Sequence, residues 1–300
     1  MKNTVIAIVL IISLFGEIFC QTNSDFSDPY SNWDGVTHWS KYMRYSPRYF
    51  GPNALPVPKN MNGRISENLE FRLAAEYHHH SQDPTYNAFT SLEIPIVKNR
   101  VNLEIHVVPI EFYNMDTSLR IERRTFNKEG KSTAGGDIYV NQHIQIIQNH
   151  KKIPDMALRF GLRTASGLQL RHARFTDAPG YYFDLSLGKD FLLSKTDSSR
   201  IRLYASGGFY CWHTNENDRR QNDAFMYGVG IDLLVKKTKV SLQASGYSGY
   251  IDNGDKPLVV RAKIEPTNKH KFRPYLQIQQ GLNDFPYTSF QIGLIFSPLR

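Results

Sequence analysis

Charged side chains recur at alternate positions within segments that are otherwise apolar. This spacing places them on one face of a strand, which we expect to face an interior: Glu70, Arg72, Glu76, Glu93, Glu104, Arg159, Arg163, Asp184, Arg202, Asp232, Arg261 and Lys263. Acids and bases are nearly balanced, and two interpretations stay open. The charges pair into a network that fills the interior, since buried charges need partners, or they line a polar path or a gate.

Two shorter motifs near residue 80 hold residue types that carry chemistry. Glu76, His78 and His80 share one parity, so possible metal ligands would stand about 7 Å apart along a strand. His79 and Ser81 form a His-x-Ser pair, and barrel lipid hydrolases use a serine beside a histidine. Polar residues at the rim of a strand are the simpler interpretation of both motifs. We therefore expect no metal, no cofactor and no catalytic residue, with a lipid hydrolase that uses His79 and Ser81 as an alternative.

Strands must position these residues. In the segment 287–296, Phe290, Ile292, Leu294 and Phe296 fall on one face and polar residues on the other. Ten residues of period two match one strand of a membrane-spanning barrel. Alternation and turn signals predict about twelve such strands, at 67–80, 85–97, 101–115, 135–149, 155–167, 181–193, 200–213, 223–236, 238–250, 256–266, 271–281 and 287–297. The expected fold class is therefore all-β, a transmembrane antiparallel β-barrel.

The connections between these segments alternate in length. The longest are 116–134, 168–180 and 214–222, and all follow odd-numbered strands, whereas the connections after even-numbered strands are short. Outer-membrane barrels have short periplasmic turns and longer external loops. We therefore expect the long loops to be external, and the last strand to pair with the first around residues 69–77.

Residues 1–20 have the pattern of a secretory signal peptide. A basic start precedes an apolar run from Val5 to Phe15, and Cys20 stands before the polar Gln21. Lipidation of Cys20 is a weaker alternative, because the bulky Phe19 precedes it. No later segment is apolar enough to span a membrane as a helix. We expect export to the outer membrane of a Gram-negative bacterium.

Residues 21–66 form a second unit, an N-terminal non-barrel segment ahead of the barrel at 67–300. The segment holds Trp33 and Trp39 and becomes proline-rich at Pro52, Pro56 and Pro58. One interpretation is a mobile periplasmic lead. The other is a plug folded into the barrel or against its periplasmic mouth, which would explain the aromatic content through burial.

The net charge is +8, and nucleic acid is the first partner to consider for a basic protein. No nucleic-acid recognition motif accompanies the charge, so we expect no nucleic acid as partner. The basic residues cluster in segments predicted as loops: Arg120, Arg123, Arg124, Lys128, Lys131, Arg171, Arg174, Arg219 and Arg220. Loop cations either are simply solvated or contact the phosphates of lipopolysaccharide. After cleavage only Cys211 remains, so a disulfide within the chain is not expected. We expect a monomer surrounded by outer-membrane lipid.

The stretch 135–191 resembles the outer-membrane barrel family described as the MetA-pathway of phenol degradation, which is similar to the fatty-acid transporters. The matching residues are GGDIYV at 135–140, PDMAL at 154–158 and RTASG at 163–167. Ala165, Ser166 and Leu168 depart from the family's pattern. The resemblance implies a barrel for uptake of small, often apolar molecules.

We therefore expect passive transport or binding of a small, possibly apolar solute, without enzymatic activity. The alternative is a structural or adhesive barrel whose external loops, 116–134 and 168–180, form a contact surface.

Overall fold

A computed structural model describes residues 34, 36–127, 129–194, 199–216, 218–267 and 270–298. The predicted signal peptide and Lys128 lie outside this part of the chain. Among the described residues, no helix is long and apolar enough to cross a membrane.

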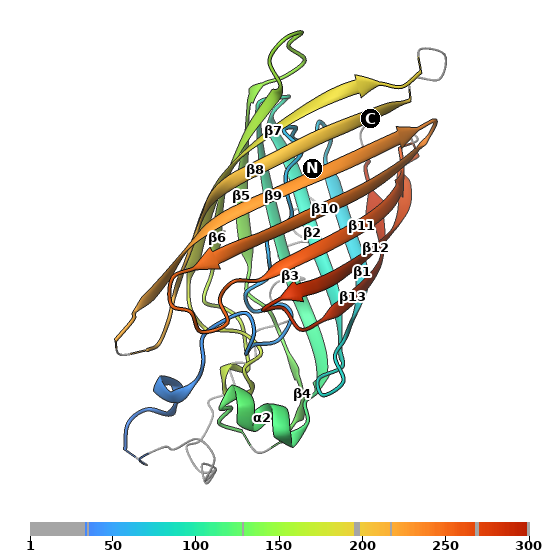
Figure 1. Ribbon diagram of the computed structural model, residues 1–300. Helices are drawn as coiled ribbons and strands as arrows, with labels where there is room; N and C mark the ends of the chain where they lie inside the picture. Colours follow the sequence, from blue (N-terminus) through green and yellow to red (C-terminus); the bar gives the residue numbers. More distant parts are fainter. Residues whose placement is uncertain are drawn as a thin grey trace, which may run out of the picture.

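The chain folds into a closed antiparallel β-barrel whose strands are tilted to its axis (Figure 1). The strands are β1 (Glu70–His79), β2 (Thr85–Val97), β3 (Val101–Asn114), β4 (Lys131–Ala134), β5 (Tyr139–Ile147), β6 (Asp155–Arg163), β7 (Gly180–Leu192), β8 (Arg200–His213), β9 (Gln221–Val235), β10 (Thr238–Gly249), β11 (Leu258–Pro266), β12 (Phe272–Asn283) and β13 (Thr288–Phe296). The predicted strands all appear, most with bounds within a few residues.

β4 adds a thirteenth strand without adding a position to the barrel wall. Both β4 and β5 pair with β3, through Ala134 opposite Glu111 and Tyr139 opposite His106. Five positions separate these pairs on each strand (139 − 134 and 111 − 106), so the register is the same. β4 and β5 therefore occupy the same strand position in the wall, with an interruption at 135–138, and the barrel has twelve strand positions.

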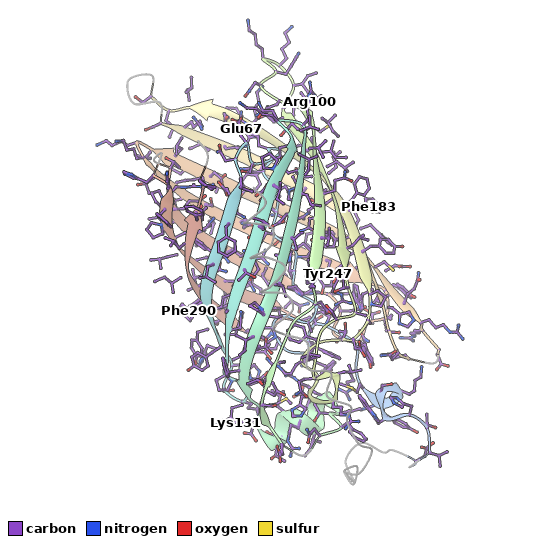
Figure 2. The ribbon with its side chains drawn as sticks, turned by 180° about the vertical axis from the view of Figure 1, so that it is seen from behind. Glu67, Arg100, Lys131, Phe183, Tyr247 and Phe290 are labelled. Carbon is purple, nitrogen blue, oxygen red and sulfur yellow. The ribbon has the colours of Figure 1, made fainter. Side chains whose placement is uncertain are left out.

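The last strand closes the barrel against the first, as predicted. β13 pairs with β1 from Phe71 opposite Phe296 to His79 opposite Thr288. On the outer face, large apolar side chains such as Leu162, Phe225 and Ile292 are exposed. Figure 2 labels two others of this kind, Phe183 and Phe290. Such a belt is stable only in lipid, and the alternating inner positions are polar, which together define a transmembrane barrel.

The two ends of the barrel differ. One end has short connections, including the two-residue turn between β9 and β10. The other end holds the long loops, with the helix α2 (Thr117–Arg123) and the 3₁₀ turns η1 (Trp39–Tyr42) and η2 (Leu170–His172), which the sequence analysis did not predict (Figure 1). We call these the short-turn end and the long-loop end.

The described part of the N-terminal segment starts at the long-loop end. Met43, Tyr45 and Phe50 are buried there in one cluster with Ala173, and Gly51 N donates to Ala173 O at 2.8 Å. The aromatic side chains of these residues are therefore buried against the long loops, which offer an apolar surface.

Candidate functional site

Residues 52–66 begin with a turn at 52–54 and then run through the lumen from the long-loop end to the short-turn end. We call this segment the strap. At its start, Arg163 Nη1 donates to Ala54 O (2.6 Å) and Tyr247 Oη donates to Leu55 O (2.9 Å). At its end, Arg64 Nε donates to Asp155 Oδ2 at 2.7 Å, beside the short turns. The strap thus spans the barrel and reduces its open cross-section.

Contacts along the middle of the strap hold its polar groups. Asn60 Nδ2 donates to the carbonyls of Val229 (3.2 Å) and Ala244 (3.0 Å), and Asn60 N donates to Gln243 Oε1 (3.0 Å). Asn62 O accepts from Arg202 Nε at 2.8 Å. These wall carbonyls and side chains satisfy strap groups that would otherwise be unpaired inside the barrel, and an unpaired buried group is costly.

Two wall glycines make room for the strap. A Cβ atom on Gly188 would lie 2.1 Å from Asn62 O, and one on Gly228 would lie 1.9 Å from Asn60 Oδ1. Within the strap itself, Gly63 has a φ of 83°, a conformation that favours glycine. The wall and the strap therefore fit each other closely.

We expect Gly188→Val to displace the strap, because the new side chain would overlap the backbone oxygen of Asn62. The single-channel conductance in planar bilayers should rise. Gly207→Val is the matched control on the neighbouring strand β8, since a Cβ at Gly207 meets nothing within 4 Å. Equal conductance in both variants would show that this contact does not position the strap.

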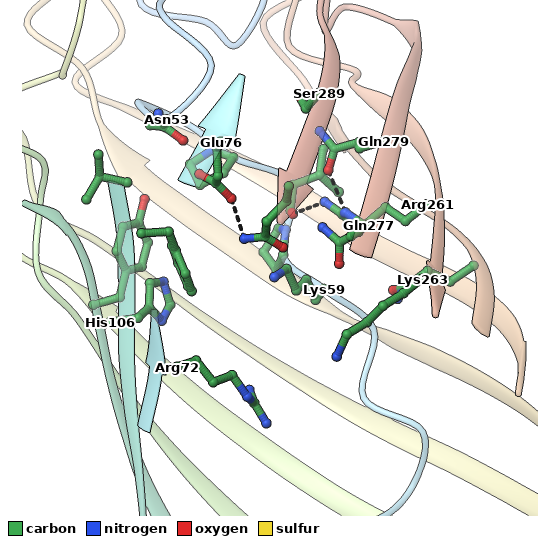
Figure 3. Close-up of a pocket in the computed structure, with 18 of the residues that line it drawn as sticks. Asn53, Lys59, Arg72, Glu76, His106, Arg261, Lys263, Gln277, Gln279 and Ser289 are labelled. Carbon is green, nitrogen blue, oxygen red and sulfur yellow. Dashed lines mark hydrogen bonds between the residues drawn. The ribbon is translucent and has the colours of Figure 1, made fainter. Parts of the chain in front are cut away.

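A cavity of about 280 Å³ lies beside the strap. Seven of the predicted interior residues line it: Arg72, Glu76, Glu104, Arg159, Asp232, Arg261 and Lys263. Lys59, on the strap, also lines it, and its side chain is solvent-exposed although it lies inside the barrel (Figure 3). Its exposure is therefore to the cavity. Sequence analysis missed Lys59, and the only sequence signal was a lysine next to Pro58 in a segment that could serve as a plug.

The interior charges are extensively paired. Arg159 contacts Asp184 at 2.6 Å, and Arg202 contacts Asp155 at 2.8 Å. The other predicted residues have these partners: Glu70 with Arg72 and Arg273, Glu76 with Asn87 and Gln291, Glu93 with Arg72, Glu104 with Asn141, Lys263 with Glu265, and Asp232 with Asn62 and Tyr204. Arg163 and Arg261 instead donate to strap carbonyls. The structure therefore contains elements of both interpretations, a paired network and a polar space within it.

A buried ionic cluster closes the long-loop end. Asp83 Oδ2 accepts from Arg123 Nη1 (2.8 Å) and Arg174 Nη1 (2.6 Å), and Arg174 Nη2 lies 2.7 Å from Glu111 Oε1. All four side chains have no exposed surface, and Tyr287 Oη also donates to Asp83. We call these five residues the loop lock.

The loop lock corrects one expectation from sequence. Arg123 and Arg174 were assigned to solvated or lipid-contacting loop positions, but both are completely buried. Arg123 ends α2, and Arg174 follows η2. Because they pair with Asp83, in the connection between β1 and β2, and with Glu111 on β3, these arginines fasten the long loops to the barrel wall.

The histidines near residue 80 are dispersed. His79 Nδ1 pairs with Tyr77 Oη on the outer face, at 3.2 Å, and in the described part of the chain the Ser81 hydroxyl contacts no histidine. His78 instead points inward, where its Nδ1 lies 2.7 Å from Ser289 Oγ and its Nε2 lies 2.7 Å from Asn87 Oδ1. This serine–histidine pair joins distant strands, so the local His-x-Ser pattern could not reveal it.

We expect neither serine to support lipid hydrolysis. With phospholipid vesicles, fatty-acid release by the wild-type protein should stay at background, and Ser81→Ala and Ser289→Ala should not alter it. Among the described residues, Ser81 contacts no histidine that could act as a general base. Ser289 does contact a histidine, but it is buried in the wall, where a lipid substrate cannot reach it. Measurable release that either substitution abolishes would restore the hydrolase hypothesis.

A transmembrane barrel with a strap in its lumen is the architecture that fold and site define together. No family model and no curated protein matches the chain. Among solved structures, an outer-membrane channel from Pseudomonas putida F1 aligns with a TM-score of 0.58 at 10% identity, over 80% of this chain and 99% of that one. The NanC porin aligns with a TM-score of 0.50 at 12% identity, over 76% and 100%. The chain therefore shares the fold of outer-membrane channel barrels.

Proposed function

We propose that the protein is an outer-membrane channel for passive diffusion of a small polar solute, and that the strap sets the width of its path. The observation that carries this proposal is the polar cavity beside the strap, inside a barrel with a lipid-facing outer wall. Twelve strands enclose more space than eight, whose interior side chains can fill, and less than the sixteen of open porins. A partly occupied lumen fits that intermediate size.

The polarity of the cavity modifies the expectation of an apolar solute. Arg72, Glu76, Glu104 and Lys263 line the cavity together with amide side chains such as Gln277. An apolar molecule would have to desolvate these groups without offering hydrogen bonds in return. The family resemblance of residues 135–191 favours an apolar cargo, whereas the lining favours a polar one, and we place more weight on the lining.

The orientation and location follow from the loop lengths. Long loops face the exterior in outer-membrane barrels, so we place the loop lock and residues 36–51 outside and the short turns in the periplasm. Residues 1–20 supply the export signal in this proposal. The named structural relatives support it through their fold alone.

Liposome swelling and single-channel recording test this function. Reconstituted protein should admit small neutral polyols and give discrete conductance steps, with rates that fall as the solute grows. Empty liposomes and heat-unfolded protein are the controls. If neither the intact protein nor Gly188→Val passes solute or ions, the channel proposal is wrong.

The loop lock favours a second candidate function. A long-loop end fastened by fully buried ion pairs is a rigid surface, which suits a structural or adhesive barrel that binds through loops 116–134 and 168–180. Absence of conductance together with binding to cells that is lost when these loops are shortened would support this candidate.

A further inference from the structure

We propose that the cavity beside the strap binds small zwitterions, such as free amino acids, because acidic residues line one part of its wall and basic residues line another. This inference rests on the proposed channel function and names the class of solute that would use it.

One wall is formed by β1, β2 and β3 and is acidic. Apart from Glu111, which belongs to the loop lock, its inward charges near the cavity are the carboxylates Glu70, Glu76, Glu93 and Glu104 and the guanidinium of Arg72. Arg72 Nη2 contacts Glu70 at 2.7 Å and Glu93 at 3.5 Å. Glu76 and Glu104 line the cavity, and both accept hydrogen bonds from neutral amides, Asn87 and Asn141. This wall therefore has an excess of negative charge.

The other wall is formed by β10, β11 and β12 and is basic. Its inward charges are the cations Lys239, Arg261, Lys263 and Arg273 and the carboxylate Glu265. Lys239 and Lys263 share Glu265 as their ion-pair partner. Among the described residues, Arg261 donates to three neutral acceptors and to no carboxylate: Gln279 Oε1 (2.6 Å), Ser245 Oγ (2.7 Å) and Val57 O (2.5 Å). This wall therefore has an excess of positive charge.

The topology places the two walls on either side of β13, which alone separates β1 from β12, whereas β5 to β9 separate β3 from β10 on the other route. Arg273 of the basic wall reaches past β13 and pairs with Glu70 of the acidic wall at 2.7 Å, and the remaining charges stay on their own walls. Figure 3 shows Glu76 and His106 on one side of the cavity and Arg261 and Lys263 on the other. A field of this kind orients a molecule that has an ammonium at one end and a carboxylate at the other.

Polar groups also connect the walls. Lys263, Gln277, Gln291 and Glu76 are successive cross-strand partners from β11 to β1. Gln291 is 5% exposed, it lines the cavity, and its Oε1 atom has no hydrogen-bond partner among the described residues. This free acceptor suits an ammonium donor.

Lys59 already places one ammonium in this space. Its Nζ lies 5.2 Å from the Phe89 ring centre and forms no ion pair or hydrogen bond with any residue that the structure describes. The strap thus presents a cation between the walls (Figure 3), and this cation forms no ion pair with Glu76 or Glu104. An entering solute would find both Glu76 and Glu104 without a bound lysine or arginine.

Swelling rates of proteoliposomes test the inference with four probes of similar size: L-serine as zwitterion, erythritol as neutral solute, lactate as anion and choline as cation. Serine should enter about three- to tenfold faster than erythritol, and faster than lactate and choline. Glu104→Gln and Lys263→Gln should each reduce the serine-to-erythritol ratio towards one. Glu122→Gln on α2 and Lys151→Gln on a short turn are exposed matched controls, and they should leave the ratio unchanged.

The outcomes separate this inference from the channel proposal. Entry of all four probes at rates set by size alone, unaffected by Glu104→Gln and Lys263→Gln, would leave the channel in place and overturn the zwitterion site. Preference for lactate over serine would overturn it in favour of an anion path. If no probe enters, the channel function itself fails. Lys239→Gln repeats the test of the basic wall if Lys263→Gln does not insert into membranes.

Discussion

Deletion of residues 34–62 is expected to raise the single-channel conductance about two- to fivefold, because the strap then no longer occupies part of a twelve-stranded lumen. The deletion removes Asn60 and Asn62 and with them the contacts to β8, β9 and β10. Gly63 and Arg64 remain, so the ion pair of Arg64 with Asp155 still fixes the entry into β1. Recording in planar bilayers at fixed salt measures the change.

A tethered strap provides the reciprocal control. In a Cys211→Ser background, Asn60→Cys and Gly228→Cys place two thiols at positions whose side-chain space is already shared. Oxidation should lock the strap and hold the conductance at or below the intact level, and a reductant should reverse this. If deletion leaves the conductance unchanged, the strap does not limit the path, and its role is purely structural.

Asp83→Asn is expected to lower the free energy of unfolding by about 3–5 kcal/mol, the usual cost of breaking a buried ion pair by removing one partner. The substitution leaves Arg123 and Arg174 buried without this charge, and Glu111 compensates only Arg174. Urea unfolding in lipid vesicles measures the loss. The loop at 164–179 should also become more sensitive to protease, because Arg174 no longer fastens it.

Asp116→Asn is the matched control for this prediction. Asp116 is an exposed residue of the same end of the barrel and caps α2 through Ser118 N. Asparagine caps helices about as well as aspartate, so this variant should unfold like the wild-type protein. A similar loss of stability in both variants would mean that the effect is not specific to the loop lock.

The Asp83 effect should depend on pH in a defined direction. Burial by itself raises the pKa of the Asp83 carboxyl, but Arg174 and Arg123 outweigh it and hold this pKa below its usual value. A carboxyl with a lowered pKa stabilises the fold at pH values above its unfolded pKa of about 4, and this stability is lost as the pH falls through the folded pKa. The difference between wild type and Asp83→Asn should therefore be constant from pH 7 to about pH 5 and shrink in stronger acid.

The sequence by itself determined the barrel. Period-two alternation placed Phe290 and Ile292 outside and Gln291 inside, and the structure confirms that β13 closes against β1. This inference succeeds because each strand meets lipid on one face and polar surroundings on the other, so apolar and polar residues must alternate along every strand. The lengths of the connections are local as well, which is why the long loops were found at one end.

Only the tertiary structure decided what the lumen contains. The course of residues 52–66, the burial of Arg123 and Arg174, and the position of Lys59 between two charged walls all depend on contacts between segments far apart in the chain. Alternation states that a side chain faces inward, but not which strand it faces. That partner is set by closure of the barrel and by the path of the strap. The sequence therefore identified the interior acidic and basic residues, and only the folded protein shows which of them lie next to one another.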